Sequence, residues 1–145
     1  MKIPEDKRIA LVGSSGSGKT TLVKLLYRFY DIDGGQIIID GNDIRDFKQD
    51  SLRSEMSIVP QECILFDDTI YNNVKFSNPS ASKEDVMNAI KFAQLDKVIM
   101  RLPEREDTIV GERGVKLSGG EKQRVSIARA ILADKKILIL VYAQS

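Results

Sequence analysis

The 145-residue sequence predicts an α/β fold in which a parallel sheet is flanked by helices. Two observations favour this class. Apolar, β-branched runs alternate along the chain with segments that have the helical period. Residues 137–140 are apolar at every position, which is typical of a strand covered on both faces inside a parallel sheet. With 42% apolar and 30% charged residues, the chain has the composition of a globular domain.

The first half of the chain alternates short strands with one helix. Residues 9–12 form an apolar run that stops at a glycine, which predicts a buried strand. Residues 19–30 have the pattern of a helix covered on one side, ended by turn-forming residues. Residues 36–41 are a β-branched run ending in Asp-Gly, which predicts a strand closed by a turn. Residues 56–60 predict another strand, stopped by proline.

The second half is mostly helical until its last strand. From residue 67 to 103 the pattern is helical, and Ser82-x-x-Asp85 predicts a capping box at one helix start. Ser118 opens a second helix that ends near residues 134–136, before the strand at 137–140. On that helix we expect Arg124 and Arg129 to belong to a solvated face.

Composition excludes several function classes. The charge sum is 22 − 21 = +1, which argues against nucleic acid as a partner. There is no histidine, so histidine-based acid–base catalysis and histidine–metal sites are excluded. The single cysteine excludes an internal disulfide and predicts a reduced thiol. No apolar run is long enough to span a bilayer and the N-terminus has no secretory leader, so we expect a soluble chain.

The strongest motif is a phosphate-binding loop between the first predicted strand and helix. The pattern G-x-x-x-x-G-K-S/T is met at Gly13, Ser14, Ser15, Gly16, Ser17, Gly18, Lys19 and Thr20, and Thr21 follows. Glycines allow backbone N–H groups to converge on phosphate oxygens, and the helix N-terminus adds a positive dipole. We expect Lys19 to contact the β- and γ-phosphates and the Thr20 hydroxyl to ligate Mg²⁺.

A second motif begins at residue 117, with the letters Leu-Ser-Gly-Gly-Glu-Lys-Gln-Arg. Ser118 is placed to cap a helix, and Glu121 to complete the capping box. Gly119 and Gly120 leave first-turn N–H groups uncovered, which indicates a second anion-binding helix terminus. Taken alone, the same letters also fit an ordinary well-capped helix.

Together the two motifs resemble those of ATP-binding cassette (ABC) proteins, whose signature is LSGGQ, here with Glu121 in place of the commoner glutamine. Gln61, after a predicted strand, looks like the family's Q-loop glutamine. Residues 108–114 resemble the TxVGERG segment of exporter-type members, and residues 36–44 resemble the antiparallel β-subdomain. The resemblance covers residues 8–140 and is nearest to multidrug and mitochondrial half-transporters.

The resemblance implies a single, partial nucleotide-binding domain with a P-loop NTPase core. The core would comprise residues 1–61 and 115–145, with a small antiparallel β-subdomain and a helical subdomain at residues 62–114. In the family, ATP and Mg²⁺ are held in a head-to-tail dimer. The resemblance implies that the P-loop contacts ATP in cis and that Thr20 and Gln61 lie near the metal. It also implies that the γ-phosphate is covered in trans by Ser118, Gly119, Gly120 and Glu121.

The implied partners are a second nucleotide-binding domain, identical or different, and the transmembrane domains of an exporter. The implied location is the cytosolic or matrix side of a membrane. Residues 66–70 lie where the family contacts transmembrane coupling helices, although a packed Phe66 and a helix cap at Thr69 explain the same residues.

The sequence departs from the family pattern after residue 140. The metal-organising aspartate is replaced by Val141 and the general-base glutamate by Tyr142, and the switch histidine has no counterpart. A positioned general base contributes about 10²–10⁴ in rate, so we expect this chain to bind ATP without hydrolysing it alone. Truncation is the favoured explanation; an engineered fragment, a frameshift and true decay are the alternatives.

Two other functions stay open. The chain fits a nucleotide-binding module without catalysis, in which ATP only drives dimer closure. It also fits a soluble, non-transport ABC protein acting on DNA or ribosomes, although the short spacing between the motifs argues against the DNA-repair type with its long coiled coil.

Overall fold

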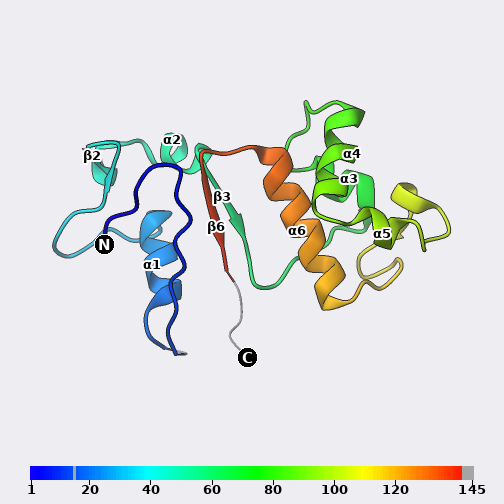
Figure 1. The fold of residues 1–145 in the computed structure, drawn as a ribbon, viewed down its shortest axis with the longest axis horizontal. Helices are drawn as coiled ribbons and strands as arrows, with labels where there is room; N and C mark the ends of the chain where they lie inside the picture. The colour runs from blue at the N-terminus through cyan, green and yellow to red at the C-terminus, as the bar shows by residue number, and fades with distance from the viewer. Residues whose placement is uncertain (15, 142–145) are drawn as a thin grey trace. The chain divides into compact units, whose positions relative to one another are not determined.

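The computed structural model describes residues 1–14 and 16–141, and it contains two compact units. The first unit is Met1–Leu52, and the second begins at Arg53. Figure 1 gives the order of the elements along the chain. The division between core and helical subdomain at residues 61 and 62 stays a prediction.

The first unit contains one helix and one small hairpin. Helix α1 spans Lys19–Leu26, and strands β1 (Ile38–Ile39) and β2 (Asn42–Asp43) pair antiparallel. Asp40 and Gly41, both with positive φ, form the two-residue turn that suits the twist of such a hairpin. A 3₁₀ turn, η1 (Ile44–Asp46), follows, and α2 (Gln49–Ser54) crosses into the second unit. The predicted antiparallel β element is therefore confirmed, with shorter strands.

Two sequence-based predictions for the first unit are wrong. Residues 9–12 form no strand, and Val12 is 78% exposed. A strand needs a neighbour to accept its ladder hydrogen bonds, and none of the strands described in this unit pairs with these residues. The predicted helix over residues 19–30 ends at Leu26. Arg28 takes a left-handed conformation there, and the Phe29 N–H bonds the Lys24 carbonyl, which closes the helix as a Schellman motif.

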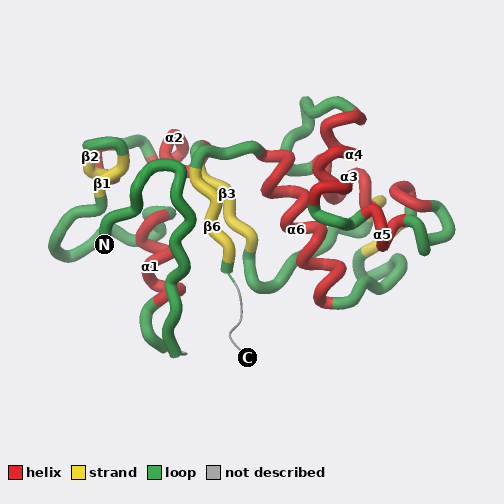
Figure 2. The backbone as a smooth tube through the Cα atoms, viewed as in Figure 1, coloured by secondary structure: helices red, strands yellow, loops and turns green. Residues whose placement is uncertain are grey.

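The second unit contains the predicted parallel sheet. Strand β3 (Met56–Val59) pairs in parallel with β6 (Ile137–Leu140), from Met56 opposite Ile137 to Val59 opposite Leu140. Figure 2 shows the two strands side by side. Parallel neighbours require a long crossover, and all the remaining helices of this unit lie in that connection. The α/β class with a parallel sheet is confirmed.

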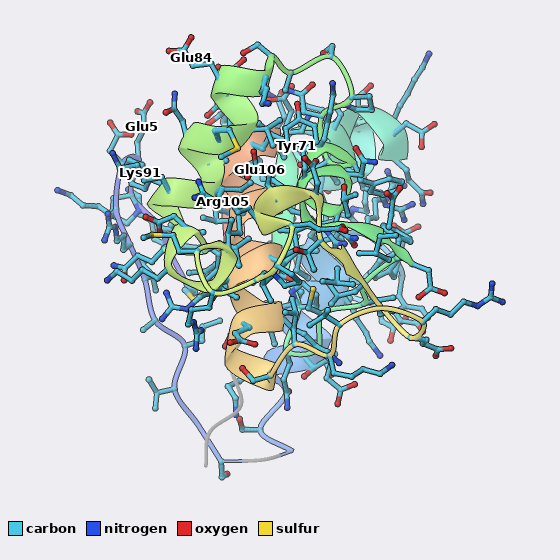
Figure 3. All side chains as sticks on the ribbon, turned by 90° about the vertical axis from the view of Figure 1, so that its right-hand side faces the viewer. Glu5, Tyr71, Glu84, Lys91, Arg105 and Glu106 are labelled. Atoms are coloured by element: carbon cyan, nitrogen blue, oxygen red, sulfur yellow. The ribbon has the colours of Figure 1, made fainter. Side chains whose placement is uncertain are left out.

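The crossover is mainly helical and holds the core. It contains β4 (Asp68–Thr69), α3 (Ile70–Lys75), α4 (Lys83–Phe92), α5 (Asp96–Ile99), η2 (Arg105–Asp107), β5 (Ile109–Val110) and α6 (Gly119–Ala133). Helix α6 packs against α3, α4 and β3. The fully buried apolar side chains include Ile70, Val74, Val86, Ile90, Leu95 and Val125. Glu84 and Lys91 of α4 are exposed, as Figure 3 shows.

The helix starts follow the sequence closely. The predicted capping box at Ser82 and Asp85 is confirmed, since each side chain bonds the other's backbone N–H. Thr69 caps α3 by accepting from the Asn72 N–H at 3.0 Å. Asp134 ends α6 in the left-handed region. Over the ranges described, no helix combines the length and apolar character that crossing a bilayer requires.

The burial of α4 predicts two unequal substitutions on one helix. Ile90→Ala should lower the free energy of unfolding by about 2–5 kcal/mol, because Ile90 is fully buried and its removal leaves a cavity. Phe92→Ala should change it by less than about 0.5 kcal/mol, because Phe92 is 82% exposed. Urea denaturation followed by circular dichroism measures both. Equal losses at the two positions would contradict the packing described here.

Candidate functional site

The glycine-rich loop of the first unit is closed by the side chain of Lys19. Its ammonium group donates to the carbonyl oxygens of Gly13 and Ser14, the latter at 2.8 Å, and to Ser17 Oγ at 3.2 Å. The Ser17 N–H bonds the Ser14 carbonyl at 3.2 Å. The predicted lysine thus lies across the loop that precedes it. Ser15, a predicted contact, lies outside the described residues.

Glycines permit this loop at three positions. Gly16 and Gly18 have φ values of +80° and +91°, in the left-handed region that costs other residues strain. A Cβ on Gly13 would lie 2.6 Å from Ser17 Oγ, so a side chain there would require the Ser17 side chain to move. Backbone geometry therefore requires glycine at residues 16 and 18, and contact with a side chain favours it at residue 13.

Helix α1 begins at this loop with an uncapped N-terminus. Gly18 is the N-cap and supplies no side-chain hydrogen bond, and the first turn contains no acidic residue. The first N–H groups of a helix have no partner within it and carry the positive end of the dipole. Thr20 and Thr21 are exposed in this turn. The arrangement offers amides, two hydroxyls and one ammonium group to an anion.

The second motif forms the predicted capping box at the start of α6. Ser118 Oγ accepts from the Glu121 N–H at 3.2 Å, and Glu121 Oε2 accepts from the Ser118 N–H at 2.8 Å. Arg101 also donates to Glu121 Oε1 at 3.0 Å. The backbone hydrogen bond from Ser118, aided by the Ser118 hydroxyl and Arg101, holds the pKa of Glu121 below its usual value despite some burial.

The two glycines of this motif are not explained by packing. A Cβ on Gly119 or on Gly120 would meet nothing within 4 Å. A hollow of about 370 Å³ lies beside them, lined by Lys97, Arg101, Arg124 and the helix start. The amides of this turn can therefore be approached closely from outside, in a basic environment.

Gln61 and Val141 follow the ends of neighbouring strands. Because β3 and β6 are parallel and in register, both residues lie beyond the same edge of the sheet. Gln61 is exposed, while Val141 is half-buried and donates its N–H to the Val59 carbonyl at 3.0 Å. Tyr142, the other predicted departure, lies outside the described residues. Within residues 1–14 and 16–141, no three acidic, cysteine or histidine side chains gather as a metal cluster.

A polar network that the sequence did not reveal ties residues 64–69, which follow Gln61 in the chain, to α3 and α6. The prediction that Arg129 belongs to a solvated face is wrong. Its Nε donates to the Asn73 carbonyl at 2.7 Å, its Nη2 to Asn73 Oδ1 at 2.9 Å and its Nη1 to the Ile64 carbonyl at 2.8 Å. Arg129 lies four residues after Val125 and three before Leu132, both buried, so it shares the core face of α6. This helical spacing from two apolar residues was the signal in the sequence that could have placed Arg129 on the core face.

Asn73 completes this network from α3. It is fully buried, accepts from the Phe66 N–H at 2.9 Å and donates to the carbonyls of Phe66, Asp68 and Thr69. Burial lowers the pKa of the Arg129 guanidinium, which nevertheless stays protonated near neutral pH. Arg124, by contrast, is half-buried, and its one hydrogen bond within residues 1–14 and 16–141 goes to the Ala93 carbonyl, at 3.3 Å.

The segment of residues 108–114 packs against the chain that follows Gln61. Strand β5 pairs with β4, and the Arg113 N–H bonds Asp67 Oδ1 at 3.1 Å. Gly111 is required here, because its φ is +105° and a Cβ would collide with Asp67. The Phe66 ring packs against the Phe76 ring, with 4.6 Å between the two ring centroids, and Phe66 remains 43% exposed. The site thus brings together residues 61–69, residues 108–114 and α6.

The capped carboxylate of Glu121 predicts a pH-dependent stability difference. Its folded-state pKa is lowered, so its contribution is present above the unfolded-state pKa and is lost as pH falls through the folded-state pKa. Glu121→Gln should therefore be less stable than the wild type by about 0.3–1 kcal/mol near pH 7, with the gap closing towards about pH 3.

Urea denaturation at both pH values tests this expectation. Glu104→Gln is the control, because the Glu104 carboxylate is exposed and makes no hydrogen bond within the described ranges. A gap that widens as pH falls would contradict the assigned role of Glu121.

Comparisons with known proteins bear on the whole chain. A family model described as ABC transporter matches residues 1–140. The iron–sulfur clusters transporter ATM1 of Saccharomyces cerevisiae mitochondria is 49% identical over 143 residues, which are 99% of this chain and 21% of that protein. A putative multidrug export ATP-binding/permease protein of Staphylococcus aureus is 50% identical over 145 residues, 100% of this chain and 25% of that protein.

A solved structure is also similar. It is described as a bacterial Atm1-family ABC exporter with ATP bound, and it superimposes with a TM-score of 0.81 at 50% identity. The match covers 88% of this chain and 22% of that one. The chain thus spans about a fifth to a quarter of the length of the relatives it matches.

Proposed function

The chain belongs to the ABC transporter family, and from that premise we propose that it is the ATP-binding part of a transporter's motor domain. In this role ATP draws two nucleotide-binding domains together, and the closure is coupled to export through transmembrane domains. The observation that carries the proposal is the loop of residues 13–20, with its left-handed glycines and the lysine lying across it, ahead of an uncapped helix.

The chemistry of this loop suits a triphosphate. Backbone amides, the α1 dipole and the Lys19 ammonium all favour negative charge at one place. We assign the triphosphate contacts to residues 13–21, as the sequence predicts. An ATP-bound state is described for the similar bacterial exporter, which supports ATP as the nucleotide for this chain.

The start of α6 is proposed as the lid over a nucleotide held by another copy. Gly119 and Gly120 leave its first amides open to outside approach, and Ser118 and Glu121 hold the turn in shape. Head-to-tail pairing would place this turn on the γ-phosphate of the partner's ATP. The partner is a second nucleotide-binding domain, either identical or different.

Mg²⁺ fits the residues present only in part. Thr20 and Gln61 supply neutral oxygen atoms, which Mg²⁺ accepts alongside phosphate oxygens. When bound, the ion would neutralise phosphate charge. Val141 brings an apolar side chain to the strand edge where the family has an aspartate, so this chain contributes no carboxylate there. Gln61 can orient a water molecule, but its neutral amide does not accept the proton.

The relatives support the proposed partners and location. ATM1 is a transporter and the Staphylococcus aureus relative is an export ATP-binding/permease protein, so we place this chain on transmembrane domains, at the cytosolic or matrix face of a membrane.

We also propose residues 1–61 and 115–145 as the ATPase core and residues 62–114 as the helical subdomain. Val141 also favours a second candidate for this chain, a module that binds ATP without hydrolysing it.

The nucleotide assignment predicts a selective loss of binding. Lys19→Ala should weaken ATP binding by about tenfold or more, because it removes a charge-assisted contact worth about 1.5–3 kcal/mol. Lys24→Ala, on the same helix and exposed, should bind ATP as the wild type does. Isothermal titration calorimetry measures both affinities. Equal affinities in all three proteins would refute the assignment.

The residues that follow β6 in the sequence predict that this chain does not hydrolyse ATP. Incubated with ATP and Mg²⁺, the 145-residue chain should release phosphate at the background rate, because a positioned general base contributes about 10²–10⁴ in rate and Tyr142 stands in the sequence where the family has its general-base glutamate. A coupled phosphate assay measures this, with Lys19→Ala as the blank. Lysine-dependent release well above that blank would show that another group acts as the base.

A further inference from the structure

The chain on the two sides of Gln61 is anchored to different elements. Before it, β3 is held in the parallel ladder, which extends to the bond between the Val141 N–H and the Val59 carbonyl. After it, the Ile64 carbonyl accepts from Arg129, and the Phe66 N–H donates to Asn73 Oδ1. The first anchor belongs to the sheet, and the second belongs to α3 and α6.

The stretch between the anchors has no fixed partner among the described residues. Pro60, Gln61 and Glu62 are exposed, and neither Gln61 nor Glu62 makes a hydrogen bond within the described part of the chain. The position of Gln61 is therefore set by where its two flanks are held. Arg129 fixes the downstream flank to α6, the same helix that begins at the Ser118–Glu121 turn.

We propose that Arg129 is a positioning residue that holds the segment following Gln61 against α6. Any displacement of α6 is then transmitted to Gln61. The inference rests on the proposed function, in which both ends of this connection face nucleotide. Arg129 itself contacts no nucleotide in this scheme. It acts through the backbone of residues 63–66.

The geometry requires arginine and not just a positive charge. One planar guanidinium group donates from Nε, Nη1 and Nη2 to three oxygen atoms, at 2.7, 2.8 and 2.9 Å. It also lies 5.3 Å from the centre of the Phe66 ring and 3.6 Å from Cys63 Sγ. A lysine has one nitrogen at the end of a flexible stem and cannot span these positions together. Arg129→Lys therefore keeps the positive charge but loses the set of hydrogen bonds that holds residues 63–66 against α6.

The chain contains its own reporter of this segment. Cys63 is the only cysteine in the sequence, it is half-buried, and it lines a hollow of about 210 Å³. A small thiol reagent such as dithiobis(nitrobenzoate) therefore reports on residues 63–66 alone. Arg105→Lys is the matched control, because Arg105 is exposed on the same unit and, among the described residues, forms no hydrogen bond with residues 63–66.

The experiment measures the labelling rate of Cys63 in the 145-residue chain, with and without MgATP. Without nucleotide, Arg129→Lys should raise the rate about tenfold, because local opening no longer breaks the charge-assisted bonds to Ile64 and Asn73. In the wild type and in Arg105→Lys, saturating MgATP should change the rate at least about twofold. Arg129→Lys should bind ATP with unchanged affinity by calorimetry, yet its labelling rate should no longer respond.

The outcomes separate this inference from the proposed function. If ATP binds the wild type and the Cys63 rate does not respond, or responds equally in Arg129→Lys, the positioning role is overturned. If ATP does not bind the wild type, the proposed function fails, and equal nucleotide-free rates in Arg129→Lys and Arg105→Lys would overturn the hold of Arg129 on residues 63–66 as well.

A measurement without substitutions covers the case in which Arg129→Lys does not fold, as judged by circular dichroism. In the wild type, MgATP should alter hydrogen exchange in residues 63–69 and in the first turns of α6 together. A change confined to one of the two segments would overturn the inference.

Discussion

The parallel pairing of β3 with β6 is the constraint on which the second unit depends. It joins segments that are far apart in the sequence, so everything between them must form one crossover connection. The helices of that connection bury the core, and α6 returns the chain to the sheet. Because the strands are parallel and in register, their carboxyl ends coincide, and Gln61 and Val141 follow at one edge.

The two helix N-termini treat negative charge in opposite ways. The first turn of α1 contains no acidic residue and has Lys19 beside it, so its field is fully available to an anion. The first turn of α6 already holds the Glu121 carboxylate, which Arg101 partly compensates. Of its amides, the two that belong to glycines stay open to approach. A phosphate at the N-terminus of α6 therefore meets a weaker positive potential than one at the N-terminus of α1. Binding at α6 depends more on the shape of the turn and on access to its amides.

The Asn73–Arg129 network shows how one buried polar side chain can specify the conformation of an exposed loop beside an apolar core. Asn73 is fully buried and uses both its amide nitrogen and its oxygen, so no polar atom of its side chain is left unpaired. Every carbonyl that it binds belongs to residues 66–69. A different path for this segment would leave buried donors and acceptors unsatisfied, at a cost of about 1–3 kcal/mol each.

The sequence alone determined those features that depend on local backbone chemistry. The capping boxes at Ser82 and Ser118, the turn at Asp40–Gly41 and the positions of the loop glycines are each set by residues within a few positions of one another. The parallel class followed from the apolar run at residues 137–140. The end of α1 did not follow, because Arg28 adopts the left-handed conformation that sequence reasoning expects of glycine.

Only the tertiary structure decided which side chains meet across long separations. Residues 9–12 have strand composition, yet composition cannot supply the neighbouring strand that a ladder needs. Arg129 has the charge of a surface residue, yet its guanidinium group donates hydrogen bonds to the carbonyl groups of residues 64 and 73. Hydrogen bonds of this kind depend on where distant backbone is brought, and that position is a property of the packed core.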